Sequence, residues 1–120
     1  MNGQLPHVRK RRKELLEELV KIEQMRRGSL CLQVFEVTRK DGAKAYQGPY
    51  ALYTYKQKGK TVSRRVTNPG HVPRYQEQID AFRRFEALTG ELVRIGERIS
   101  DLVLSDEEEL KKKRSRRGKE

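Results

Sequence analysis

The chain lacks tryptophan and has one cysteine, Cys31, among its 120 residues. A lone cysteine has no intrachain partner for a disulfide, which is typical of proteins kept in a reducing cytosol. Long apolar runs are also absent: no stretch approaches the roughly 18 residues that a bilayer span needs, and residues 1–8 lack the apolar core of a signal peptide. We therefore expect a cytoplasmic protein that does not span a membrane.

Residues that usually carry enzyme chemistry are scarce. The two histidines, His7 and His71, lie far from each other and from Cys31 in sequence, so no metal site is recognisable. The Gly-Lys-Thr at residues 59–61 resembles the end of a phosphate-binding loop, but no glycine stands five residues before it and no helix follows. A tyrosine nucleophile would be similar to those of DNA strand transfer, yet nothing in the spacing requires one. We expect no catalysis, no cofactor and no metal.

Positive charge, in contrast, is abundant: the formal net charge is +11. Residues 9–13 are all basic, residues 111–120 hold seven basic and one acidic residue, and residues 14–110 hold 16 of each. Like-charged blocks usually stay solvated and act as arms for nucleic acid. The sequence therefore predicts disordered basic arms that neutralise phosphates, with the contacts made by Arg9, Lys10, Arg11, Arg12, Lys13, Lys111, Lys112, Lys113, Arg114, Arg116 and Arg117.

Two stretches have the apolar period of a helix. Apolar residues at helical spacing predict a first helix over residues 8–27, with Gly28 in the position of a left-handed cap. An apolar period near 3.5 predicts a second helix over residues 72–104, which begins near Pro73. The second helix is the longer, so an antiparallel pairing leaves part of its apolar stripe uncovered.

The uncovered stripe predicts a homodimer, because an exposed apolar surface of that size should find a partner. The alternative is that the stripe packs back on the rest of the chain. The predicted interface residues are Leu92, Ile95, Ile99, Leu102 and Val103.

Between the helices, β-branched and aromatic residues predict strands over residues 30–38, 50–57 and 60–67, with a loop at 39–48. A two-residue turn at Lys58-Gly59 places Tyr55 opposite Val62 and Tyr53 opposite Arg64. Taken together, the elements predict an α+β fold in which two long antiparallel helices flank a small three-stranded antiparallel sheet. We expect one domain over residues 14–110, preceded by a basic arm or helix start at 1–13 and followed by a basic tail at 111–120.

Two motifs in this body are candidates for nucleic-acid contact. Arg26 and Arg27 next to Gly28 and Ser29 could hold a phosphate, because arginine forks match its oxygens. The same residues could instead end the first helix, or make Ser29 a phosphorylation target. On the hairpin, aromatic and basic residues could stack on bases or enter a duplex groove, or simply cover a thin core and supply soluble edges. The hairpin residues are Tyr50, Lys60, Arg64 and Arg65.

The spacing of short motifs resembles a family of small bacterial proteins of unknown function. The shared pattern is Arg-Arg-Gly-Ser at 26–29, Gly-Pro-Tyr at 48–50 and Gly-Lys-Thr at 59–61, followed by an Arg-Arg-Phe run at 83–85. Members often carry a cysteine cluster before the Gly-Pro-Tyr, whereas this chain has none there. They are also often encoded near transposase-like genes, so the resemblance implies a DNA-linked role without supplying an active site.

The sequence as a whole predicts a non-enzymatic protein that binds nucleic acid, DNA rather than RNA, as an accessory or regulatory factor. Its basic arms would supply most of the affinity, and it would be associated with the nucleoid in the cytoplasm. The alternative function is a protein-interaction or assembly module that uses the long second helix.

Overall fold

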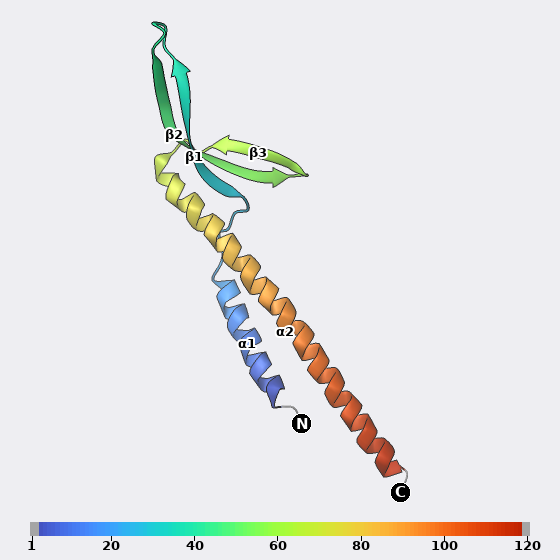
Figure 1. The fold of residues 1–120 in the computed structure, drawn as a ribbon. Helices are drawn as coiled ribbons and strands as arrows, with labels where there is room; N and C mark the ends of the chain where they lie inside the picture. Colours follow the sequence, from blue (N-terminus) through green and yellow to red (C-terminus); the bar gives the residue numbers. More distant parts are fainter. Residues whose placement is uncertain (1–2, 119–120) are drawn as a thin grey trace. The chain divides into compact units, whose positions relative to one another are not determined.

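The computed structural model describes residues 3–118, with side chains described to residue 115. Its elements are α1 (Gln4–Val20), β1 (Ser29–Thr38), β2 (Lys44–Gln57), β3 (Lys60–Arg65), a 3-10 turn (Pro69–His71) and α2 (Val72–Gly118) (Figure 1). The chain divides into two compact units. We call residues 24–83 the sheet unit and the rest the helical unit. The predicted α+β class and the three-stranded antiparallel sheet are confirmed.

In the helical unit, α1 runs antiparallel to the part of α2 that follows residue 83. Contacts at both ends of α1 fix this direction: Glu18 Oε2 lies 3.4 Å from Arg84 Nη2, while Gln4 accepts a hydrogen bond from Arg98. The apolar stripes of the two helices supply the buried side chains of this unit, which are Leu15, Leu88 and Leu102. The predicted antiparallel helix pair is therefore present.

Both basic runs are helical over the described residues. The predicted helix from residue 8 is confirmed for the first run, whereas the prediction of disordered tails is wrong. Residues 9–13 lie inside α1, and α2 continues through the C-terminal run to Gly118. Glutamates at 107–109 stand four residues before lysines at 111–113, the orientation in which such pairs stabilise a helix. In α1, Glu14 and Glu17 stand four residues after Lys10 and Lys13, which is the weaker of the two orientations of such a pair. The blocks of positive charge are thus compensated along their own helices.

The apolar stripe of α2 that was predicted to be exposed is buried or half-buried in the single chain. Leu102 is only 5% exposed, and Leu92, Ile95, Ile99 and Val103 are half-buried. The reason is the position of α1, which begins at Gln4 rather than at residue 8 and so extends further along α2. The homodimer stays a prediction, without the exposed stripe that motivated it.

The sheet has the order β1-β2-β3, and its predicted register is confirmed. Tyr53 pairs with Arg64 and Tyr55 with Val62. The turn at Lys58-Gly59 has positive φ at both central residues, 52° and 79°, as a two-residue hairpin turn requires. Alternation along the strands then gives two faces. The inner face carries Tyr53, and we call the opposite side, which carries Arg65, the outer face.

β2 begins at Lys44, earlier than the predicted strand start at residue 50, because it continues past an irregularity. Gln33 pairs with Tyr50 and Phe35 with Gln47, so β2 has one residue more than β1 at this point. Gly48 absorbs the extra residue: its φ is +121°, and a Cβ there would lie 2.7 Å from the Gln33 carbonyl oxygen. Beyond it, residues 33–38 and 44–49 form a two-stranded ribbon, which we call the β-arm. The predicted loop shrinks to residues 39–43.

The core of the sheet unit lies on the inner face. Its buried apolar side chains are Ala51 and Tyr53 from β2 and Ile79 from the first turns of α2. The segment before β1 has no regular secondary structure, and in it the Arg26 N–H donates to the Gln78 carbonyl oxygen at 3.0 Å. The first helix therefore ends at Val20 instead of continuing to residue 27.

Gly28 begins the approach to β1 and does not cap a helix. Its φ is +113°, and a Cβ there would meet the Thr54 carbonyl oxygen at 2.2 Å. Only glycine permits the backbones of residues 28 and 54 to come this close. Over residues 3–118, neither helix has the length and apolar composition of a membrane span.

Candidate nucleic-acid interface

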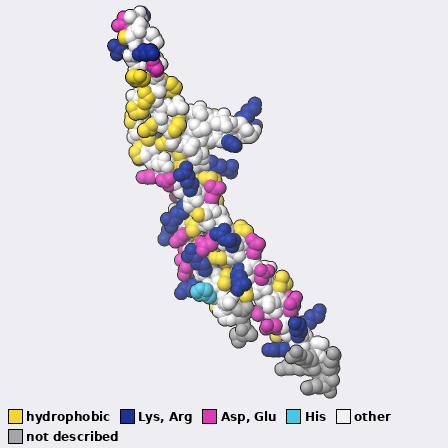
Figure 2. All heavy atoms as spheres, viewed as in Figure 1, with side chains coloured by type: hydrophobic (Ala, Val, Ile, Leu, Met, Phe, Trp, Pro, Cys, Tyr) yellow, Lys and Arg dark blue, Asp and Glu magenta, His cyan; other side chains and the backbone are white. Residues whose placement is uncertain are grey.

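When charge is summed by folded unit, most of the net positive charge belongs to the sheet unit, because acidic residues of the helical unit offset the terminal runs. The sheet unit has twelve basic and four acidic residues, a net charge of +8, whereas the helical unit has 16 basic and 13 acidic residues. From residue 42 to residue 76 there are seven basic residues and no acidic one. In Figure 2, basic and acidic side chains are mixed over α1 and α2. A polyanion would therefore meet its most uniform positive field at the sheet.

Of the predicted N-terminal contacts, Arg11 is already engaged. Its Nε donates to Glu91 Oε1 at 2.9 Å and its Nη2 to Glu91 Oε2 at 3.1 Å, while Nη1 donates to Glu14 at 3.3 Å. The hydrogen bonds that Arg11 donates to Glu91 lower the pKa of Glu91, and the hydrogen bonds that Arg11 donates to Glu91 and Glu14 raise the pKa of Arg11. Arg11 thus joins α1 to α2 and is not a free phosphate ligand.

The other terminal cations lie on helix surfaces. Those with exposed side chains are Arg9, Lys10, Arg12, Lys13, Lys111, Lys112, Lys113 and Arg114. The side chains of Arg116 and Arg117 lie outside the described residues. Exposed lysines and arginines on a helix can still contact phosphates, but here they share the helix with carboxylates.

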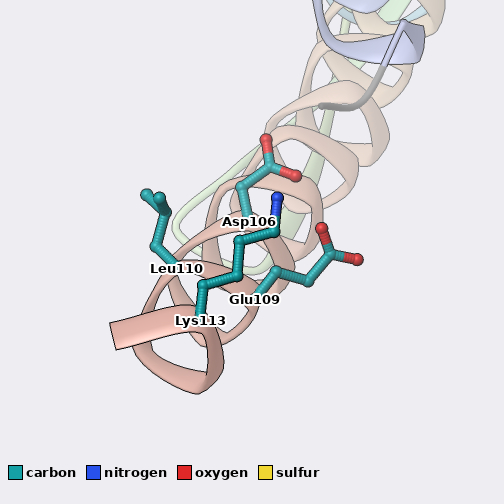
Figure 3. A pocket seen from close by; sticks show the side chains of 4 residues that line it. All are labelled: Asp106, Glu109, Leu110 and Lys113. Atoms are coloured by element: carbon teal, nitrogen blue, oxygen red, sulfur yellow. The ribbon is translucent and has the colours of Figure 1, made fainter. Parts of the chain in front are cut away.

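A hollow near the C-terminal end of α2 illustrates this mixture. Its lining comes from a single helix face and consists of Asp106, Glu109, Leu110 and Lys113 (Figure 3). The Lys113 side chain extends back towards the two carboxylates in this view. Among the described residues, no group of three or more histidine, cysteine or acidic side chains could hold a metal ion. The hollow is a solvated helix surface carrying both signs of charge.

Two of the predicted contact residues, Arg26 and Arg64, belong to the inner face. The Arg26 guanidinium carbon lies 4.2 Å from the Tyr75 ring centre, and its Nε donates to Gln78 Oε1 at 3.0 Å. Arg64 Nη2 donates to the Tyr75 hydroxyl at 3.2 Å, and the Arg64 guanidinium carbon lies 5.6 Å from the Tyr53 ring centre. These arginines hold the sheet against the first turns of α2, so their main role is structural.

The outer face carries a row of three side chains, one from each strand. The rings of Phe35 and Tyr50 are 5.8 Å apart, and the Arg65 guanidinium carbon lies 3.5 Å from the centre of the Tyr50 ring. Phe35 is 46% exposed, Tyr50 is half-buried and Arg65 is exposed. We call Phe35, Tyr50 and Arg65 the stacking row. It presents an aromatic ring and a guanidinium plane to solvent.

Further along the outer face, hydroxyl groups gather around an open cavity of about 390 Å³. Thr54 and Ser63 share a hydrogen bond of 3.0 Å between their side-chain oxygens. We call the cavity the hydroxyl corner, and its lining residues are Arg27, Gly28, Ser29, Thr54, Tyr55, Lys56 and Thr61. Of the predicted phosphate motif at residues 26–29, Arg27, Gly28 and Ser29 line this cavity, but the guanidinium carbons of Arg26 and Arg27 lie 4.2 Å and 5.9 Å from the ring centres of Tyr75 and Phe82 on α2.

Sequence reasoning identified some of this interface and missed the rest. Tyr50 and Arg65 were predicted contacts and lie together, whereas Lys60 lies next to the exposed turn between β2 and β3. Lys56 and Thr61 were not singled out, although strand alternation already placed them on the outer face. Phe35 was also missed. It lies beside Tyr50 because of the extra residue in β2 at Gly48, and the sequence pattern did not predict this irregularity.

Comparisons of the chain with protein-family models, curated proteins and solved structures find no match. The resemblance to the small bacterial family therefore stays a prediction. The function is inferred below from the charge, exposure and geometry of this chain's own residues.

Proposed function

We propose that the protein binds nucleic acid, DNA rather than RNA, as a non-enzymatic accessory or regulatory factor. The observation that carries the proposal is the acid-free segment from residue 42 to residue 76, which contains β2, β3 and the turn between them. Lys44 of this segment lies 3.4 Å from Glu36 on β1, whereas Lys56, Lys58, Lys60 and Arg65 are exposed near the β2–β3 hairpin and can neutralise phosphates. The choice of DNA follows the resemblance to proteins encoded near transposase-like genes.

The terminal runs act as auxiliary contacts in this account. Exposed cations on α1 and at the end of α2 add long-range attraction, which salt screens over about 8 Å at physiological ionic strength. Sheet cations make the close contacts. Binding should then weaken steeply with salt, with a slope of about −0.9 per neutralised phosphate on duplex DNA and about −0.7 on single strands.

Two variants with four cations removed from each region test the proposal. One changes Lys56, Lys58, Lys60 and Arg65 to glutamine, and the matched one changes Arg9, Lys10, Arg12 and Lys13 to glutamine. Fluorescence anisotropy with labelled duplex DNA, single-stranded DNA and RNA across a salt series measures binding. We expect the sheet variant to lose most affinity and the α1 variant to lose less. Absence of binding by the unaltered chain at low salt would contradict the proposal.

A second candidate function is a protein-interaction module based on α2. Exposed apolar side chains on that helix favour it: Val93, Leu104 and Leu110 are each more than half exposed. Apolar contacts strengthen at high salt, whereas phosphate contacts weaken. A complex with a partner protein that persists at high salt and after nuclease treatment would support this function instead.

A further inference from the structure

We propose that the outer face of the sheet binds unpaired bases, so that the nucleic acid it selects is single-stranded. The proposal rests on the proposed function and adds the form of the ligand and its site. Bases stack on the stacking row, and the phosphate backbone continues towards the hydroxyl corner.

The stacking row has the chemistry that unpaired bases need. Bases stack on aromatic rings and on guanidinium planes, each of which contributes without regard to sequence. The guanidinium carbon of Arg65 lies over the Tyr50 ring, 3.5 Å from its centre, and the Arg65 side chain is exposed. Tyr50 thus positions Arg65, while the half-exposed ring of Phe35 offers a second surface on β1.

The remainder of the outer face suits a backbone that crosses the sheet. Cys31 pairs with Leu52 on this face, so a small and an apolar side chain lie between the row and the hydroxyl corner. From Tyr50 to Lys56 along β2 the distance is about 20 Å at 3.3 Å per residue. Lys56 can neutralise a phosphate at that end, and the hydroxyls of Ser29, Thr54 and Thr61 can donate to its oxygens.

Single strands fit this face better than a duplex does. In a duplex the faces of the bases are covered by their neighbours, so stacking surfaces on a protein gain nothing from them. Charge alone would attract a duplex at least as well as a single strand, because the duplex has the higher charge density. The stacking row therefore predicts a preference for single strands, which the charge of the sheet unit does not predict. This difference lets an experiment test the inference separately from the proposed function.

The absence of tryptophan permits a direct reporter of stacking. Phe35→Trp places a single tryptophan in the row, and Tyr46→Trp places one on the other side of the β-arm, where Tyr46 is 72% exposed. Addition of oligothymidine should quench the Phe35→Trp fluorescence strongly and that of Tyr46→Trp weakly. Equal quenching of the two reporters, or none, would overturn the proposal. Far-UV circular dichroism confirms that both variants are folded.

Affinity measurements complete the test. Tyr50→Ala should weaken oligothymidine binding roughly 5- to 150-fold with little change in its salt slope, while Tyr50→Phe should bind like the unaltered protein. Arg65→Lys keeps the charge but loses the plane and should also bind weakly. Duplex binding equal to or tighter than single-strand binding, with no effect of Tyr50→Ala, would refute this inference and leave the proposed function intact.

Measurements with oligouridine beside oligothymidine distinguish recognition of the unpaired bases from recognition of the sugar. Tighter binding of oligouridine that depends on Tyr50 would support recognition of unpaired bases and overturn the preference for DNA. Failure of the unaltered chain to bind any of the three nucleic acids would instead refute the proposed function itself.

Discussion

At the scale of single residues, neighbouring side chains on one strand have different tasks because they face opposite sides of the sheet. Arg64 donates to Tyr75 on the inner face, whereas Arg65 stacks on Tyr50 on the outer face. A one-residue shift in register would exchange these tasks. The pair Arg64-Arg65 is therefore a sensitive indicator of which face binds.

The two arginines should respond differently to alanine substitution. Arg64→Ala removes one hydrogen bond and several ring contacts, so we expect it to lower the free energy of unfolding by about 1 kcal/mol. Arg65→Ala should change stability less and weaken nucleic-acid binding more. Urea titration followed by circular dichroism, beside anisotropy, measures both quantities. The reverse pattern would show that the inner face carries the binding site.

Gly28 is the residue whose substitution should cost most stability. Gly28→Ala puts a Cβ 2.2 Å from the Thr54 carbonyl oxygen at a φ that side chains rarely adopt, so the free energy of unfolding should fall on the order of 3 kcal/mol. Gly42→Ala is the matched control, because its φ is +83° but nothing lies within 4 Å. That change should cost about 1 kcal/mol. Equal losses in both variants, measured by urea titration, would mean that the close approach at residue 28 is unimportant.

At the scale of elements, the helices show how charge runs can mislead. A block of five cations favours a solvated arm, yet α1 contains it because Glu14 and Glu17 stand one turn away and Arg11 reaches Glu91 on α2. The helix pair in turn depends on that ion pair more than its sequence revealed, since the partner lies 80 residues away.

The Arg11–Glu91 pair makes the stability of the helix pair depend on pH. Because Arg11 lowers the pKa of Glu91 in the folded state, its contribution is fully present above the unfolded pKa, about 4.3, and is lost as the pH falls through the lower folded value. Glu91→Gln should therefore lower Tm at pH 7, and this difference should shrink as the pH falls below the unfolded pKa of Glu91. A Tm difference that is constant from pH 7 to pH 3 would contradict this role.

Much of the fold could be predicted from the sequence, because its strongest signals are local. Lys58-Gly59 predicted the β2–β3 turn, because glycine readily adopts the positive φ that such a turn requires. The long apolar period predicted α2. The end of α1 and the β-arm could not be predicted, since both depend on contacts between distant residues, such as Arg26 with Gln78 and Gly48 with Gln33. For the candidate site, alternation located Tyr50 and Arg65 but not Phe35.

At the scale of the whole molecule, charge is divided unequally between the two units. The sheet unit has half of the residues and a net charge of +8, while the terminal runs are offset by acidic residues of their own unit. Linear charge runs suggested arms as the main binding device. The sum by folded unit favours the sheet, and the proposed function therefore places the main contacts there, with α1 and the end of α2 as auxiliary contacts.

The central claim, that nucleic acid covers the outer face of the sheet, is tested most directly on the unaltered chain. Cys31 is the only cysteine, is exposed and lies on the outer face opposite Leu52. Its rate of reaction with a thiol reagent should fall several-fold when oligothymidine saturates the protein, and recover at high salt. An unchanged rate while anisotropy reports full binding would place the nucleic acid elsewhere and contradict the account.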